Sequence, residues 1–137
     1  MTDEKLLHSE ITDLIIKAYY HVYNTLGYGF LEKVYENALL LTLRKWGLTV
    51  AQQVPVKVYF EGDQVGDYFA DLIVGDCVII ELKAANGIDE AHEAQLLNYL
   101  RATDKEVGLL LNFGPKAEFR RKVFANERKG RSRVSKV

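Results

Sequence analysis

Residues 69–83 read Phe-Ala-Asp-Leu-Ile-Val-Gly-Asp-Cys-Val-Ile-Ile-Glu-Leu-Lys. Two apolar runs flank a Gly-Asp pair, and this pattern predicts two strands joined by a tight turn. Glu81 and Lys83 are two residues apart on the second strand, so their side chains point to the same face. Charged groups in such an apolar strand are costly to bury unless they are paired or bound to a metal ion. The hairpin therefore combines a predicted sheet centre with a candidate charged site.

The register of this hairpin decides whether a third charge, that of Asp71, joins the site. A two-residue turn at 75–76 would place Asp71 opposite Ile80, on the other face of the sheet. A three-residue turn, or a one-residue bulge, would place Asp71 opposite Glu81. A site that uses both carboxylates requires the second arrangement, and the sequence leaves both open.

The rest of the chain supplies helices and further strands. Apolar residues at helical spacing predict helices over about 8–26, 30–46 and 89–102. Alternating or continuous apolar runs predict strands over about 49–60, 65–74, 77–83 and 106–113, with a final edge strand over 119–124. The order ααβββαβ predicts an α/β (α+β) fold with a mixed central sheet flanked by helices. A meander of three strands is followed by a right-handed crossover to a parallel fourth strand.

Length and composition indicate one globular domain. The chain has 137 residues, of which 48% are hydrophobic and 27% charged, so residues 1–125 suffice for a single core. The net charge is −1, but lysines and arginines gather after residue 115. Residues 126–137 are therefore predicted to form a flexible basic tail. Its cations are either simply solvated or contact nucleic-acid phosphates; the candidates for such contacts are Arg128, Lys129, Arg131 and Arg133.

Several classes of protein are disfavoured. No apolar run is long enough to span a bilayer, and the acidic, polar start does not resemble a signal peptide. Cys77 is the single cysteine and cannot form an internal disulfide. These features predict a cytoplasmic protein that does not bind membranes. The histidines lack metal-ligand spacing with Cys77, and no serine lies in a nucleophile elbow.

The acidic pair suits a hard divalent cation. Asp71 and Glu81 on one face would bind Mg²⁺, with Mn²⁺ as an alternative, and the backbone carbonyl of Leu82 would add an oxygen ligand. Such an ion would neutralise a scissile phosphate and activate a bound water. Lys83 would position or deprotonate that water, or stabilise charge on phosphorus. The competing interpretation is an ordinary ion pair between Glu81 and Lys83 on an exposed strand face.

These residues resemble the signature of a known superfamily. Asp71, nine intervening residues and Glu81-Leu82-Lys83 are similar to the PD-(D/E)xK nuclease motif, with Ala70 in place of the proline. The predicted order of elements is similar to that superfamily's core. Residues 29–35, Gly-Phe-Leu-Glu-Lys-Val-Tyr, also resemble the motif that names its GxxExxY branch. The resemblance covers residues 8–124 and implies a metal-dependent nuclease fold, without implying a substrate.

The resemblance also implies an acidic residue on the helix before the sheet. Glu32 and Glu36 are four residues apart and share one helical face. Glu36 lies eleven residues before Gly47, a spacing similar to that of the helix glutamate in Holliday-junction resolvases. Glu36 is therefore favoured as a direct or water-mediated metal ligand, with Glu32 second. One or both could instead be solvated helix residues.

Gln95 and Tyr99 lie four apart on the predicted crossover helix. They resemble the Q-x-x-x-Y motif of several PD-(D/E)xK branches. The motif implies that Gln95 faces the metal site and that Tyr99 contacts nucleic acid or packs nearby. For Tyr99, ordinary core packing is a strong alternative.

The sequence and the resemblance therefore favour a magnesium-dependent nuclease, with DNA in branched or single-stranded form favoured over RNA as the substrate, although the sequence leaves DNA and RNA both open. The alternative is a catalytically silent nucleic-acid-binding or accessory protein-interaction module that retains the fold. Tyr19, Tyr20 and Tyr23 on the first helix offer a surface for a homodimer, or they belong to the core.

Overall fold

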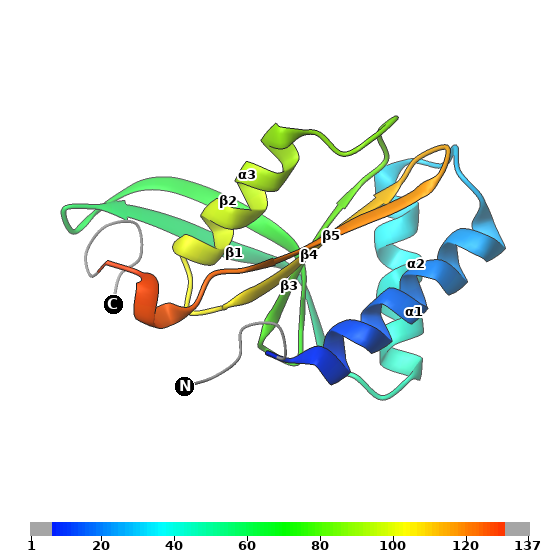
Figure 1. Ribbon diagram of the computed structural model, residues 1–137, viewed down its shortest axis with the longest axis horizontal. Coiled ribbons are helices and arrows are strands. Elements are labelled where there is room, and N and C mark those ends of the chain that lie inside the picture. Colours follow the sequence, from blue (N-terminus) through cyan, green and yellow to red (C-terminus); the bar gives the residue numbers. More distant parts are fainter. Residues whose placement is uncertain (1–6, 131–137) are drawn as a thin grey trace.

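A five-stranded sheet forms the centre of the protein, as shown by a computed structural model that describes residues 7–130. Figure 1 shows the paired helices α1 and α2 on one side of the sheet and α3 on the other. The helices are α1 (Ser9–Leu26), α2 (Glu32–Lys45), α3 (Glu90–Arg101) and the short 3₁₀ helix η2 (Asn126–Arg128). The strands are β1 (Val50–Phe60), β2 (Asp63–Val74), β3 (Val78–Lys83), β4 (Val107–Phe113) and β5 (Ala117–Val123).

Strand pairing confirms the predicted mixed sheet. The order is β1-β2-β3-β4-β5, with β3 and β4 parallel and the other neighbours antiparallel. The predicted edge strand exists as β5, although it begins two residues earlier than expected. Strand β2 also begins earlier, because Glu61 and Gly62 alone form the turn after β1, both with positive φ. Two such residues are typical of a tight type I′ turn.

The hairpin between β2 and β3 has a three-residue turn. Val74 pairs with Val78, so residues 75–77 form the connection, and its first two residues have φ near 59° and 56°. The register continues to Leu72 opposite Ile80. Asp71 therefore comes opposite Glu81, which is the arrangement that a two-carboxylate site requires.

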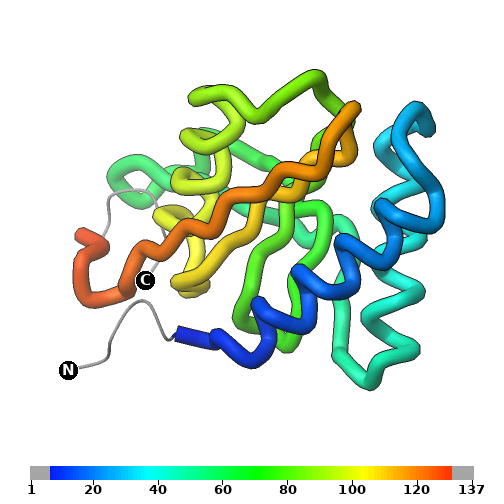
Figure 2. The backbone as a smooth tube through the Cα atoms, turned by 45° about the vertical axis from the view of Figure 1, so that its right-hand side comes forward, coloured from blue at the N-terminus to red at the C-terminus, as the bar shows by residue number. Residues whose placement is uncertain are grey.

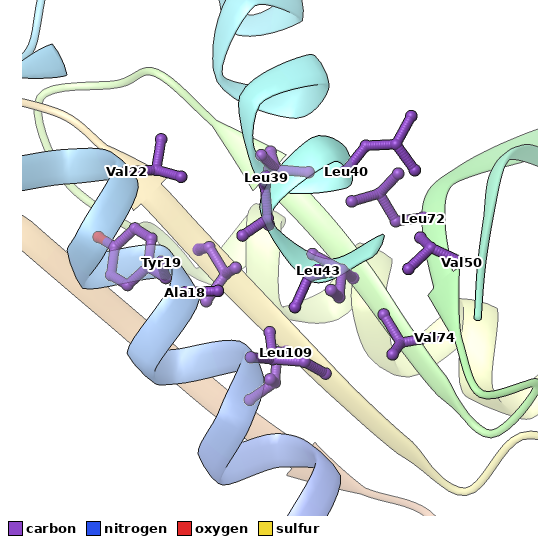
Figure 3. Close-up of a cluster of buried hydrophobic side chains, with 14 of the residues drawn as sticks. Ala18, Tyr19, Val22, Leu39, Leu40, Leu43, Val50, Leu72, Val74 and Leu109 are labelled. Carbon is purple, nitrogen blue, oxygen red and sulfur yellow. The ribbon is translucent and has the colours of Figure 1, made fainter. Parts of the chain in front are cut away.

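Two apolar cores cover the two faces of the sheet. Figure 3 shows the larger core, where α1 and α2 pack on β2 and β4 through residues such as Ala18, Leu39, Leu72 and Leu109. The second core lies under α3 and contains Ile79 and Leu96. Because side chains alternate along a strand, Glu81 and Lys83 share the α3 face with Ile79. The charged site is thus built on the sheet face that the smaller core occupies.

The aromatic residues of α1 divide between core and surface. Tyr19 is fully buried, and its hydroxyl donates to the carbonyl of Asn112 and accepts from the N–H of Glu118 at 2.8 Å. Tyr23 is partly buried, whereas Tyr20 is 38% exposed. Of the two alternatives for Tyr19, the structure shows the core, because that ring anchors α1 to the β4–β5 end of the sheet.

The described part of the C-terminal segment is packed onto the domain. The N–H of Asn126 donates to the Glu106 carboxylate at 2.8 Å, and its side-chain amide donates to the carbonyl of Asp104 at 2.9 Å. The Lys129 ammonium donates to the carbonyls of Thr103 and Lys105. Residues 126–129 of the predicted tail therefore pack on the domain through contacts with the segment that follows α3, and residues 131–137 lie outside the described residues. In residues 7–130, no helix is long and apolar enough to cross a membrane.

Candidate functional site

The site lies where β2 and β3 separate. Their pairing ends at Leu72 and Ile80, while β2 continues beside β1 and β3 continues beside β4. We call this divergence the fork. At the fork, the N–H of Asp71 donates to Oε1 of Glu81 at 3.1 Å, and the N–H of Leu82 donates to Oδ2 of Asp71 at 2.8 Å. Each carboxylate therefore replaces a backbone acceptor on the opposite strand, and this fixes both side chains side by side.

Negative charge at the fork is poorly compensated. Glu81 is 4% exposed, and burial, followed by the charge of Asp71, raises its pKa from 4.5 to about 8. Burial also raises the pKa of Asp71, even though the Leu82 N–H opposes this shift. Among the described residues, no donor reaches Oε2 of Glu81. A neighbouring cation would favour the ionised form of both groups.

Glu36 reaches the fork from α2. Its carboxylate is 3% exposed and accepts from the Lys33 ammonium at 2.9 Å. The side-chain amides of Gln52 and Gln53 also donate to it, at 2.6 Å and 3.0 Å. Glu36 is therefore a buried, fully bonded group rather than a solvated helix residue.

Gln53 connects the helix carboxylate to the fork. The same amide that donates to Glu36 lies 3.3 Å from Oδ1 of Asp71. Gln53 has a φ of 52°. Its neighbours Gln52 and Val54 pair with Leu72 and Ala70 on β2, but Gln53 itself forms no strand pair there. A non-glycine residue in this conformation is strained by about 1 kcal/mol or more and is held by its surroundings.

Sequence reasoning missed Gln52 and Gln53. Both lie in a segment that was correctly predicted as a strand, and a glutamine on a strand is usually an exposed residue. The available signal was local: the alternation of Val54, Val56 and Val58 does not extend back through two consecutive glutamines. This break in the alternation of apolar and polar residues coincides with the positive φ of Gln53.

Glu32 and Lys83 stand at the rim of the fork. Burial and the charge of Asp71 raise the pKa of Glu32, while Lys83 and the Ala84 backbone lower it. The Lys83 charge also lowers the pKa of Glu81 and Asp71. Within the described residues, Lys83 makes no close ion pair, so its ammonium acts on these groups through space and is available to a bound anion.

Gln95 and Tyr99 lie beside the fork on α3. The amide of Gln95 donates to the Tyr99 hydroxyl at 3.0 Å, and Tyr99 is almost completely buried against the smaller core. Burial raises the pKa of Tyr99, and the charges of Glu81 and Asp71 add to this shift. Tyr99 thus combines core packing with proximity to the site. Among the residues described, Gln95 makes no direct bond to either fork carboxylate.

The basic residues predicted to contact phosphates are elsewhere. Figure 2 shows η2, which contains Arg128, at the end of the molecule away from α2. The guanidinium of Arg128 stacks over the Phe124 ring at 5.0 Å, and the Lys129 ammonium is bound by carbonyls. Arg131 and Arg133 lie outside the described residues.

The fork fits a divalent cation held by few protein ligands. Within residues 7–130, no group of three or more His, Cys, Asp and Glu side chains is arranged to hold a metal ion. Magnesium, however, is usually bound through one or two carboxylates, with water and substrate phosphate as the remaining ligands. Glu81 Oε2 and Asp71 Oδ1 are hard oxygen atoms, and burial raises the pKa of both carboxyl groups. Their chemistry matches this type of site, with Leu82 as a candidate carbonyl ligand.

Comparison with known proteins agrees with this architecture. A structure titled "Crystal structure of SSO0001" shares the fold with a TM-score of 0.54 and 18% sequence identity. The match covers 69% of this chain and 50% of that one, so this chain spans about half the length of that protein. No curated protein sequence matches the chain. The family model described as the PD-(D/E)XK nuclease superfamily matches residues 9–122. The chain therefore belongs to the PD-(D/E)XK nuclease superfamily.

Proposed function

We propose that this protein is a divalent-metal-dependent nuclease that hydrolyses phosphodiester bonds at the fork. The observation that carries the proposal is the pairing of Asp71 and Glu81: the buried Glu81 carboxylate and the partly buried Asp71 carboxylate lie side by side, and neither forms an ion pair within residues 7–130. Two such groups beside a free ammonium, that of Lys83, form a site for a cation and a phosphate together. Mg²⁺ is the proposed ion and Mn²⁺ the alternative.

Each residue has a distinct proposed role. Asp71, Glu81 and the Leu82 carbonyl would hold the cation, and Gln53 keeps the Asp71 carboxylate oriented through its amide. A bound divalent ion would polarise the scissile phosphate and lower the pKa of a water molecule. Lys83 stabilises negative charge that develops on the phosphate oxygens. Glu36, bonded to Gln53, either contacts the cation through water or fixes Gln53 in place.

The proposed substrate is DNA, in branched or single-stranded form. With a net charge of −1, the protein as a whole is not attracted to the phosphates of a long duplex. The exposed loop before α2 carries the first three residues of the GxxExxY-like segment, and Tyr28, Phe30 and Leu31 in this loop are at least half exposed. Such apolar groups near the rim residue Glu32 suit contact with unstacked bases better than contact with a phosphate backbone.

A direct cleavage assay tests the proposal. Labelled linear, single-stranded and four-way-junction DNA would be incubated with the protein in Mg²⁺, Mn²⁺ or chelator. We expect cleavage only with metal, and a decrease of about 100-fold or more in Lys83→Ala and Asp71→Asn. Lys57→Ala, an exposed lysine on β1, is the matched control. Cleavage that persists in both site variants would refute the assignment.

Gln53 provides a second, finer test. Gln53→Ala should lower kcat/KM about 10-fold, because supporting groups of a metal site typically contribute 10- to 100-fold. Gln53→Gly should lose the same activity and yet be more stable than Gln53→Ala, by up to about 1 kcal/mol, because glycine relieves the strained φ. Activity assays and denaturant unfolding separate the two effects, with Gln64→Ala as an exposed control on the same hairpin. Unchanged activity in both variants would contradict a positioning role.

One observation favours the alternative of a catalytically silent binding module. Glu36 is already fully engaged by Lys33, Gln52 and Gln53, and so has little freedom to act as a ligand. The same assay distinguishes this case. Tight binding of DNA or of a protein partner, without cleavage of any substrate in either metal, would identify the chain as a silent or accessory member of its superfamily.

A further inference from the structure

A cavity of about 600 Å³ lies between the β1–β2 hairpin and α3, beside the fork. Its hairpin wall includes Val58, Gly66 and Tyr68, and its helix wall includes Gln95, Asn98 and Arg101. Figure 1 shows α3 over the part of this hairpin nearer the sheet centre, with the tip of the hairpin projecting past the helix. The volume is within the range of roughly 300–1,000 Å³ that is usual for ligand pockets.

The hairpin wall presents an aromatic ring. Tyr68 is 50% exposed, and its ring centroid lies 6.0 Å from that of Tyr99, at an angle of 44°. Gly66 leaves space for this ring, because a Cβ at that position would approach the ring to 2.9 Å and the Val58 side chain to 3.2 Å. Tyr68 therefore has an accessible face that another flat ring can stack on.

The helix wall presents polar edges. The side chains of Gln95 and Asn98 line the cavity, and the Arg101 guanidinium donates to the Asn98 amide oxygen at 3.4 Å. Amides offer both donors and acceptors, which can match the edge of a heterocyclic base. An aromatic platform combined with amide and guanidinium edges is the usual way in which proteins bind unpaired bases.

The cavity lies on the same side of the sheet as the proposed cleavage site, and Tyr99, which packs in the core on that side, is one of its lining residues. Gln95 lines the cavity and donates to the Tyr99 hydroxyl at 3.0 Å. The charges of Asp71 and Glu81 reach that hydroxyl. A base in the cavity would therefore belong to a nucleotide next to a phosphate at the fork.

We propose that this cavity binds one unpaired nucleobase of the substrate strand, next to the phosphate at Asp71 and Glu81. The proposal rests on the nuclease function proposed above and makes it more specific. The preferred substrate is then single-stranded or locally unpaired nucleic acid, because a base stacked in a continuous duplex cannot enter the cavity without being extruded.

Binding of DNA oligonucleotides that carry 2-aminopurine at single positions tests the proposal in the presence of chelator, where cleavage is suppressed. We expect Tyr68→Ala to weaken binding of single-stranded DNA about 10-fold, the scale of one stacked base, and to abolish a position-specific change in 2-aminopurine fluorescence. Tyr68→Phe should retain both. Phe69→Ala is the matched control, because Phe69 is equally exposed at 50% and adjacent on the same strand, with its side chain directed to the opposite face.

The outcomes separate this inference from the proposed catalysis. Equal effects of Tyr68→Ala and Phe69→Ala, or equal losses for single-stranded and fully paired DNA, would overturn the base pocket, even if the protein cleaves DNA. Tyr68-dependent binding without any metal-dependent cleavage would support the pocket and refute the nuclease activity. A Tyr68-dependent affinity for a protein partner, with none for DNA, would also overturn the inference.

Discussion

Glu81→Gln is expected to stabilise the metal-free protein at pH 9 by on the order of 3 kcal/mol and to reduce cleavage by about 100-fold or more. The two effects have opposite signs because the Glu81 carboxylate destabilises the metal-free fold when it is ionised but is proposed to bind the metal ion that cleavage requires. Burial and the neighbouring Asp71 raise the pKa of Glu81 to about 8, so ionising it in the folded protein is unfavourable. Glutamine is neutral and isosteric, and its Oε1 can still accept the Asp71 N–H.

The sign of the pH dependence follows from linkage. The folded protein binds the Glu81 proton more tightly than the unfolded chain does, where the pKa is near 4.5. This contribution to stability is complete below pH 4.5 and is lost as the pH rises through about 8. Wild type should therefore lose stability over this range, whereas Glu81→Gln should lose less. Near pH 4, wild type and Glu81→Gln should have similar free energies of unfolding.

Denaturant unfolding in chelator at several pH values measures this difference. Glu10→Gln, an exposed glutamate in the first turn of α1, is the matched control and should follow wild type. Added Mg²⁺ should stabilise wild type at pH 9 and have little effect on Glu81→Gln, since a ligand that binds only the folded state stabilises it. A Glu81→Gln variant that is no more stable than wild type at any pH would show that the buried charge is compensated.

The sequence predicted the fold best where the spacing of apolar residues repeats along a whole helix or strand. Apolar spacing located each helix and strand within a few residues, and it assigned Asp71, Glu81 and Lys83 to neighbouring strands. It could not choose between a two- and a three-residue turn, because that choice depends on left-handed φ angles at Gly75 and Asp76. Two alternatives remained for the register until the structure fixed the pairing of Val74 with Val78.

Long-range polar contacts were beyond any local pattern. Gln53 adopts a strained φ, and its amide bonds to groups on α2 and β2. The broken alternation marks this position in the sequence, but no window of neighbouring residues identifies the partners of the amide. The same holds for Lys129, a cation that the sequence left as either solvated or in contact with phosphates. Its ammonium is held by two carbonyls in the segment that follows α3.

Asn112→Ala is expected to lower the free energy of unfolding by about 2–4 kcal/mol, because it removes a fully buried side chain and leaves two partly buried backbone groups without partners. Asn112 is fully buried on β4, opposite Lys83 in the register. Its Oδ1 accepts from the Ala85 N–H and its Nδ2 donates to the Ala85 carbonyl, both at 2.9 Å. The side chain thus continues the β3–β4 ladder past the end of β3.

This bond pair also affects the proposed chemistry, because the segment that it holds follows Lys83 directly. Folded Asn112→Ala should therefore cleave DNA more slowly than wild type, by about 10-fold, the scale for supporting groups.

Gly114→Ala should also displace the segment at Ala85, because a Cβ at position 114 would lie 2.0 Å from the Ala85 carbonyl oxygen and must push it away. Denaturant unfolding and cleavage rates would be compared with Asn86→Ala, an exposed residue of the same loop. Stability of Asn112→Ala within about 0.5 kcal/mol of wild type, the usual range for surface changes, would mean that water or a shifted Ala85 replaces both bonds.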